Sequence, residues 1–347
     1  MRITGRAGAF TTCMASALLT AGLTAGTATA QPSLSASYDF KTLDFPGSFF
    51  SFPLGINNHR EIAGSYEDGS GNHGYRWKNG KFTIIDFPGA MQFPSSGSTT
   101  PFFFGGTAAG GINDRGDIAG TYTDRNGFQH GYVLAKPAWC GGEDDDPDEG
   151  CKAVFTQIDV PGAAQTVGIL FEFGPGLGTA AIGINNSGSV VGMYATHGQY
   201  SNGFRLSHGV FSDVSDPLAG HSPGEGSKCF AINGNGAMAC DYITNGITHG
   251  FLVDEGKRIP IEAPNQAFFG TQITGVNSSE VVVGVFGSPI GLQGLVWIAG
   301  HYSTLGFPAK PYNELHSIND RGDITGAYAN NPDGSDGHGF VAFPKER

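Results

Sequence analysis

The chain is short of basic residues. Its 347 residues include 19 Lys and Arg against 31 Asp and Glu, which gives a formal net charge of −12. The phosphate groups of nucleic acids and anionic lipids repel a protein of this sign, so neither is an expected partner. Acidity also suits cation binding, but solubility is the simpler explanation of it.

Motifs for several kinds of chemistry are missing. The sequence has no CxxC, no HExxH and no Cys/His cluster with zinc spacing, so it predicts no zinc site. It has no Ser nucleophile elbow, phosphate-cradling Gly loop or dinucleotide fingerprint in context. The apolar run near the N-terminus is interrupted by Thr and Gly and is too short to span a bilayer. No short motif therefore predicts an enzyme class.

Residues 1–30 have the pattern of a secretory signal peptide. Arg2 and Arg6 form a small basic region, an Ala/Leu-rich stretch follows, and the Ala-Thr-Ala of residues 28–30 fits the cleavage rule. A disordered N-terminus or a short membrane anchor is the alternative. The pattern predicts a secreted protein, extracellular or periplasmic, with one mature domain at residues 31–347. We expect this domain to be monomeric.

Four cysteines follow the predicted cleavage site. An even number in an exported chain indicates disulfides, and four cysteines allow three pairings. We expect the local pairs Cys140–Cys151 and Cys229–Cys240, each of which would bridge one hairpin. The first pair would close an acidic hairpin insertion at about residues 138–152, which is also a weak candidate for binding a cation.

Glycine is abundant, with 56 residues beside 26 Phe, and this composition predicts many short strands joined by tight turns. An apolar residue followed by Asn recurs six times, at intervals of roughly 40 to 70 residues that are typical of propeller blades or solenoid turns. The six markers, which define copies one to six, are Ile56-Asn57, Ile112-Asn113, Ile184-Asn185, Ile232-Asn233, Val276-Asn277 and Ile318-Asn319. Each copy reads as four short strands.

The two ends of the chain favour a closed ring. The last copy lacks a fourth strand, and residues 38–47 match the fourth strand of the first copy at residues 81–89. An N-terminal strand that completes the final blade would hide both sheet edges. An open solenoid would need polar capping repeats instead, and the sequence has none. We therefore predict an all-β, six-bladed β-propeller of four-stranded blades, closed by the N-terminal strand.

The repeat also resembles a known family. The pattern GIN-(D/N)-x-G-x-(I/V)-x-G-x-Y, followed by HG-(F/Y) and F-T-x-I-D-x-P-G-A, is similar to the HAF-type extracellular repeat and covers nearly all of the mature chain. Copy four departs from it at Cys240, where the second strand usually has Gly. Copy five departs at Phe286 and at residues 293–295. The resemblance implies a secreted repeat protein and transfers architecture rather than chemistry.

The loops between blades, and those between second and third strands, are expected on one face around the channel mouth, where binding surfaces are usual. The interblade loops are rich in Phe, which suggests an aromatic platform for a glycan or an apolar partner. The alternative is that the rings pack between blades, and only 3 Trp is few for a carbohydrate platform. The candidate ligand-binding residues are Phe50, Phe103, Phe173, Phe269, Glu172 and Glu314.

The repeated polar residues have simpler explanations. The loop carboxylates Asp68, Asp124, Asp333 and Asp336 are weak calcium candidates, but none completes an EF-hand and turn chemistry explains them. No other cofactor is expected. The recurrent histidines, which are His73, His130, His249 and His338, lie too far apart for one metal and are expected to form hydrogen bonds within each blade. The recurrent fourth-strand carboxylates Asp44, Asp86 and Asp159 are expected to cap the following turn.

Polar residues that occur in one copy only are few: Glu172, Asp241, Glu314 and His316. The sequence favours a secreted, non-enzymatic propeller that binds a glycan or a surface partner through loops on its top face. The alternative is an extracellular polysaccharide hydrolase or lyase with carboxylates at the channel mouth. A third possibility is a purely structural surface protein.

Overall fold

The computed structural model describes residues 33–92, 105–135, 153–164, 169–170, 174–175, 178–331 and 336–345. Within these ranges the chain is all-β apart from one 3₁₀ turn, η2 (Ser35–Ser37). The predicted signal peptide, the acidic insertion and the pair Cys140–Cys151 lie outside the described residues. In the described part, no helix is long and apolar enough to cross a membrane.

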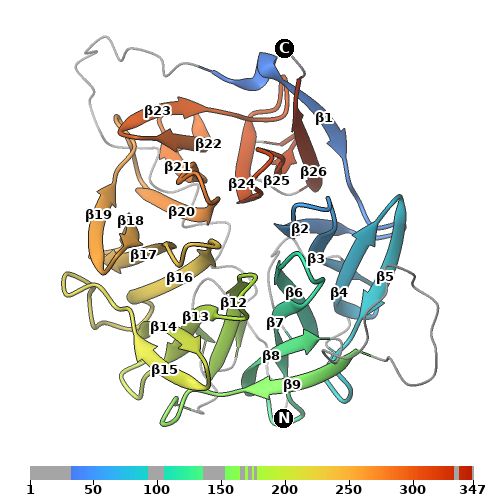
Figure 1. Ribbon diagram of the computed structural model, residues 1–347, viewed down its shortest axis with the longest axis vertical. Helices are drawn as coiled ribbons and strands as arrows, with labels where there is room; N and C mark the ends of the chain where they lie inside the picture. The colour runs from blue at the N-terminus through green and yellow to red at the C-terminus, as the bar shows by residue number, and fades with distance from the viewer. Residues whose placement is uncertain are drawn as a thin grey trace, which may run out of the picture.

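The strands form antiparallel sheets arranged around a common centre (Figure 1). Four of the sheets have four strands each. The first contains β2 (Phe50–Ile56), β3 (Ile62–Asp68), β4 (Gly71–Lys78) and β5 (Lys81–Ile85). The second contains β6 (Thr107–Ile112), β7 (Ile118–Thr123), β8 (Gln129–Ala135) and β9 (Val154–Ile158). The third contains β20 (Thr271–Val276), β21 (Val282–Ser288), β22 (Gly291–Ile298) and β23 (His301–Thr304). The fourth contains β24 (Tyr312–Ile318), β25 (Ile324–Ala329), β26 (Gly337–Pro344) and β1 (Tyr38–Thr42).

A further sheet has eight strands. Its first half is β12 (Thr179–Ile184), β13 (Val190–Ala195), β14 (Ser201–Ser207) and β15 (Val210–Asp213). Its second half is β16 (Gly226–Ile232), β17 (Met238–Thr244), β18 (Ile247–Asp254) and β19 (Lys257–Ile261). One parallel pair, Ser201 with Gly226, joins the halves. Two short strands, β10 (Ile169–Leu170) and β11 (Gly174–Pro175), pair with each other.

The all-β, propeller-like arrangement that the repeat predicts is confirmed. The number of sheets does not confirm six separate blades, because the described residues form four sheets of four strands, one of eight and one of two.

The first and last long strands of the described chain lie in one sheet. β1 is antiparallel to β26, with Tyr38 opposite Pro344 and Thr42 opposite Phe340. The pairing continues past β1, where the Leu43 amide donates to Gly339 O at 2.8 Å. Leu43 itself is buried. The two ends of the repeat array are therefore held together by backbone hydrogen bonds.

The six repeat asparagines form a closed circle of hydrogen bonds. Each Nδ2 donates to the backbone carbonyl of the Asn in the next copy, at 2.9 to 3.2 Å, and Asn319 returns to Asn57 at 2.9 Å. Each Oδ1 also accepts from two amides of its own turn, as Asn233 does from Asn235 and Ala237. All six side chains are buried. The sequence marker is thus the residue that links each copy to the next.

Glycine before the Ile-Asn marker allows the strands nearest the centre to approach one another. A Cβ on Gly55 would lie 2.5 Å from Gly110 O, and one on Gly183 would lie 2.6 Å from Phe230 O. Both distances are shorter than a carbon atom tolerates. The inner ends of neighbouring copies therefore meet backbone to backbone beside the Asn circle.

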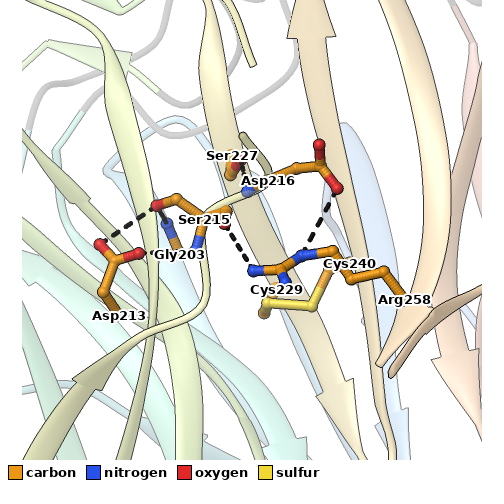
Figure 2. The surroundings of a disulfide bond; sticks show 8 residues. All are labelled: Gly203, Asp213, Ser215, Asp216, Ser227, Cys229, Cys240 and Arg258. Atoms are coloured by element: carbon orange, nitrogen blue, oxygen red, sulfur yellow. Dashed lines mark hydrogen bonds and ion pairs between the residues drawn. A yellow bond between two sulfur atoms is a disulfide. The ribbon is translucent and has the colours of Figure 1, made fainter. Parts of the chain in front are cut away.

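Cys229 and Cys240 form a disulfide, which confirms that predicted pair. They lie directly opposite each other on β16 and β17 and are fully buried. Figure 2 shows the disulfide beside Arg258, whose guanidinium donates to Ser215 O at 2.7 Å and contacts Asp216 at 3.5 Å.

Replacing both Cys229 and Cys240 by Ser should lower the free energy of unfolding by about 2 to 3 kcal/mol. The bond closes a short loop, and chain-entropy arguments give this magnitude for a loop of such length. Chemical denaturation of the oxidised protein and of the double variant measures the difference. Equal midpoints would show that the hairpin does not need the bond.

Candidate functional site

The strand of each copy nearest the centre carries the most variable side chains. These inner strands are β2, β6, β12, β16, β20 and β24 (Figure 1). Each runs from an interblade loop toward the Asn circle, and each has a register shift shortly before its Ile-Asn or Val-Asn marker. The positions seven, five and three residues before the marker Asn differ in polarity between copies.

These variable positions divide the ring into two halves. In copies one to three they hold only apolar residues or Gly: Phe50, Phe52, Leu54, Gly106, Ala108, Gly110, Gly178, Ala180 and Ile182. In copies four to six they include six polar side chains, which we call the polar half: Lys228, Gln272, Thr274, Tyr312, Glu314 and His316. A structural repeat has no need for this asymmetry, so the polar half is the candidate site.

Glu314 is the centre of a small network on β24. It accepts a hydrogen bond from the Tyr312 hydroxyl, and its other carboxylate oxygen lies 3.3 Å from His316 Nε2. His316 Nδ1 is 3.1 Å from Pro53 O of copy one. Because a carbonyl only accepts, Nδ1 carries the proton of that bond. Burial and the neighbouring carboxylate raise the pKa of Tyr312 well above its ordinary value, so the phenol stays a proton donor.

A second network joins copies four and five. Lys228 on β16 lies opposite Asp241 on β17, and both residues are buried. Gln272 on β20 donates from Nε2 to Asp241 Oδ2 at 2.9 Å. The neighbouring Thr274 reaches copy six, where its hydroxyl donates to Leu315 O at 2.7 Å. Polar contacts therefore join β20 to β17 of copy four and to β24 of copy six.

Aromatic rings border the polar half on the side of copy one. The ring of Phe52 lies 6.3 Å from that of His316 and 6.3 Å from that of Phe50. Phe50 and Phe52 are buried and pack against Ala327 of copy six. The site thus combines carboxylate, amide, hydroxyl and imidazole groups with an apolar wall.

The predicted site residues are only partly brought together. Glu314 lies in the polar half, with 16% of its side chain exposed. Phe50 lies beside it but is buried, and the exposed ring of that loop is Phe49. Phe269 is partly buried on the loop before β20, where Phe268 is exposed. Phe103, Glu172 and Phe173 lie outside the described residues.

Sequence reasoning singled out Asp241, Glu314 and His316 as unique but did not group them, and it missed Lys228, Gln272, Thr274 and Tyr312. A signal for the whole set was present. When the copies are aligned on the marker Asn, the residues seven, five and three positions earlier are polar in some copies and apolar in others.

The recurrent histidines form a structural unit in each copy that has one. His73 Nδ1 lies 2.9 Å from Asp86, His130 Nδ1 2.9 Å from Asp159, and the pairs of His249 with Glu262 and His338 with Asp44 are alike. Each ring also stacks on a tyrosine, such as Tyr66 on His73 at 5.1 Å. The expected blade-internal hydrogen bond is therefore present. The carboxylate of Asp86 bonds the imidazole rather than capping its own turn.

These pairs predict a pH dependence of stability. The hydrogen bond to Asp86 raises the pKa of His73, and Asp159 does the same to the pKa of His130. A histidine whose pKa is higher in the folded protein stabilises the fold. This stabilisation is complete at pH values below the pKa of the unfolded state, about 6.5, and is lost as pH rises through the pKa of the folded state. The thermal midpoint should therefore fall between about pH 6 and pH 8.5, a range in which ordinary carboxylates stay ionised.

In the double variant His73→Gln and His130→Gln, the thermal midpoint should vary less with pH. Thermal unfolding at matched ionic strength measures this dependence. His59→Gln is the control, because His59 is exposed and only its backbone amide is bonded. Equal slopes in all three proteins would contradict the assignment.

The calcium candidates act as turn residues. Asp124 accepts from the amides of Asn126 and Phe128, Asp68 from Ser70, and Asp336 from Asn330 and Asn331. Asp333 lies outside the described residues. Across the described ranges, no three His, Cys, Asp or Glu side chains gather as a metal site would require.

Comparisons with known proteins identify no family. No protein-family model matches the chain. No curated protein matches it either.

Some solved structures have a similar fold. One is a fungal lectin from Aleuria aurantia, described as a six-bladed β-propeller with a novel mode of fucose recognition. It is 10% identical with a TM-score of 0.44, and the match covers 86% of this chain and 89% of the lectin. AofleA from Arthrobotrys oligospora is 10% identical with a TM-score of 0.44, covering 86% of each chain. A gluconolactonase from Xanthomonas campestris is 9% identical with a TM-score of 0.43 and covers 93% of this chain and 99% of its own. At this level of likeness, none of them bears on what this chain binds.

Proposed function

We propose that this protein is a secreted propeller that binds a hydroxylated ligand, such as the end of a glycan chain, at the interblade-loop end of the polar half. The observation that carries the proposal is that, at the three variable positions of the inner strands, polar side chains occur only in copies four to six. Packing of a repeat does not require this difference between the two halves of the ring.

The chemistry of the polar half suits a sugar. Gln272, Glu314 and Tyr312 supply amide, carboxylate and hydroxyl groups, which bond sugar hydroxyls in either direction. Phe52, which is buried beside His316, makes this border of the site apolar, as suits the C–H groups of a sugar ring. Orienting polar groups beside an apolar wall are the usual composition of a small-molecule site.

The proposal includes a blade count and a location. We read the eight-stranded sheet as two blades joined by the single pair of Ser201 and Gly226, which gives six blades. The circle of six asparagines supports this reading, because one Asn belongs to each copy. Export, and membership of the HAF-type repeat family, remain proposals from the sequence.

Catalysis on a polysaccharide is the second candidate, and one observation favours it. The Glu314 carboxylate lies between a phenol hydroxyl and an imidazole, an arrangement that can hold and move a proton. Asp241 would be the second carboxylate of a hydrolase or lyase.

The substitution Glu314→Gln separates the candidates. We expect the protein of residues 31–347 to bind members of a glycan array without releasing products, and Glu314→Gln to weaken binding at least tenfold, or about 1.4 kcal/mol. Mass spectrometry of the incubated glycans detects turnover. Val210→Ser, at an exposed site on the outer strand β15, is the matched control. Product release that Glu314→Gln abolishes while binding persists would instead support the enzyme.

A further inference from the structure

Two arginines occupy equivalent places in copies one and three. Arg76 on β4 lies opposite Ala63, and Arg205 on β14 lies opposite Val191. Each guanidinium reaches toward the turn glycine of the next copy. A Cβ added to Gly116 would lie 3.4 Å from Arg76 Nη2, and one added to Gly236 would lie 4.0 Å from Arg205 Nη2. Both groups therefore sit at the junction of two copies.

In copy one a buried carboxylate neutralises the arginine. Glu61 Oε1 accepts from Arg76 Nη2 at 2.9 Å and lies 3.2 Å from Lys78 Nζ. Asn57 Nδ2, from the Asn circle, donates to Glu61 Oε2 at 3.1 Å. Burial alone would raise the pKa of Glu61, but Arg76 and Lys78 hold it below its ordinary value. The carboxylate is thus ionised between three donors.

Copy three has no carboxylate at the position that corresponds to Glu61. Ser189 stands where copy one has Glu61, and Ser207 stands where it has Lys78, with the two hydroxyl oxygens 3.0 Å apart. Among the described residues, the Arg205 guanidinium makes no hydrogen bond or ion pair, and its Nε is buried without a partner, as is the Nε of Arg76. A partly buried cation without an anion is unfavourable, and in a protein with excess acid it is unexpected.

The four remaining copies do not repeat this arrangement. The position of Arg205 is occupied there by Val133, Leu252, Val296 and Val341, which need no counter-ion. Arg205 is therefore the one arginine at this position whose copy lacks an acid four residues after the marker Asn.

We propose that the place of the missing carboxylate beside Arg205 is an anion site, which takes the carboxylate group of an acidic ligand such as a uronic acid. Arg205 would supply the charge, Ser207 a hydroxyl, and Asn185 the Nδ2 proton that Asn57 gives to Glu61. A carboxylate is the chemistry to expect, because the equivalent place in copy one seats one. The site lies beside the Asn circle and is independent of the polar half.

The test follows the Nε–H resonances of arginine by NMR while sodium acetate or sodium glucuronate is added at constant ionic strength. We expect the Arg205 signal, identified by its loss in Arg205→Gln, to shift saturably with a dissociation constant on the order of 1 to 10 mM. The Arg76 signal should stay in place, because Glu61 already pairs with the Arg76 guanidinium through Nη2. No saturable shift at Arg205 up to about 100 mM of either acid would overturn the proposal. A response to inorganic phosphate but to neither acid would overturn the carboxylate assignment.

Exchanging residues between copies provides the matched variants. Ser189→Glu restores the carboxylate of copy one, and should weaken acetate binding at least tenfold while raising the thermal midpoint. Ser189→Gln fills the same volume without charge and should not raise the midpoint. Glu61→Ser should make the Arg76 resonance respond to acetate. If Ser189→Glu does not fold, the Glu61→Ser experiment decides the matter alone, and an unresponsive Arg76 would contradict the proposal.

Discussion

A chain that lacks residues 38–47 should show no cooperative unfolding transition. The deletion removes β1, and with it the backbone pairing that joins the start of the array to β26. It also removes buried Leu43, the Asp44 partner of His338 at 2.8 Å, and Phe45, whose ring stacks on Tyr66 at 3.7 Å. The loss would exceed the roughly 5 to 15 kcal/mol that holds a typical domain folded.

Circular dichroism and thermal denaturation of the purified truncated chain measure this effect. The matched control carries Asp39→Ser and Lys41→Ser, which change exposed side chains of β1 and leave its backbone pairing intact. We expect this control to unfold within a few degrees of the unchanged protein. An unaltered melting curve in the truncated chain would show that β1 does not close the ring.

Replacing Asn233 by Ala should lower the free energy of unfolding by about 3 to 5 kcal/mol. Its Oδ1 accepts from the amides of Asn235 and Ala237 at 3.0 and 2.9 Å, and its Nδ2 donates to Asn277 O at 2.9 Å. The side chain is 5% exposed, so water cannot replace all of these bonds. Each buried group left without a partner costs about 1 to 3 kcal/mol.

Chemical denaturation of Asn233→Ala and of its neighbour Asn235→Ala provides the comparison. Asn235 is exposed, and its side chain makes one bond, to Ser278 O. We expect the change at Asn235 to cost no more than about 1 kcal/mol. Similar losses for the two variants would mean that the Asn circle contributes no more than an ordinary surface turn.

The repeat made the architecture predictable because packing imposes the same residues on each copy. The marker Asn, the turn Gly and the terminal match of residues 38–47 follow from strand pairing, and each was readable in the sequence. The function of the Asn was not, because its Nδ2 bonds a residue in the next copy, 42 or more positions away. The joining of two copies into one sheet depends on a single backbone bridge, which has no side-chain signature.

The site was less predictable for a related reason. The clusters of Phe in the loops predicted a binding surface, but Phe50 is buried and packs against Ala327. Lys228 and Gln272 are unremarkable in sequence, since single polar residues in strands are common. Their significance appears once register places Lys228 opposite Asp241 and brings Gln272 onto it from the next strand. The sequence pattern does not show which residues of different copies contact one another.

The most direct test of the central claim compares two double variants in a glycan-binding titration of the protein of residues 31–347. One carries Gln272→Ala and Glu314→Gln in the polar half, and the other carries Phe49→Ala and Phe268→Ala in the exposed loops. If the ligand binds at the polar half, the first variant loses at least a hundredfold in affinity, or about 2.7 kcal/mol, while the second loses less than tenfold. Unchanged affinity in the first variant, with binding abolished in the second, would contradict the claim and place the ligand on the loops.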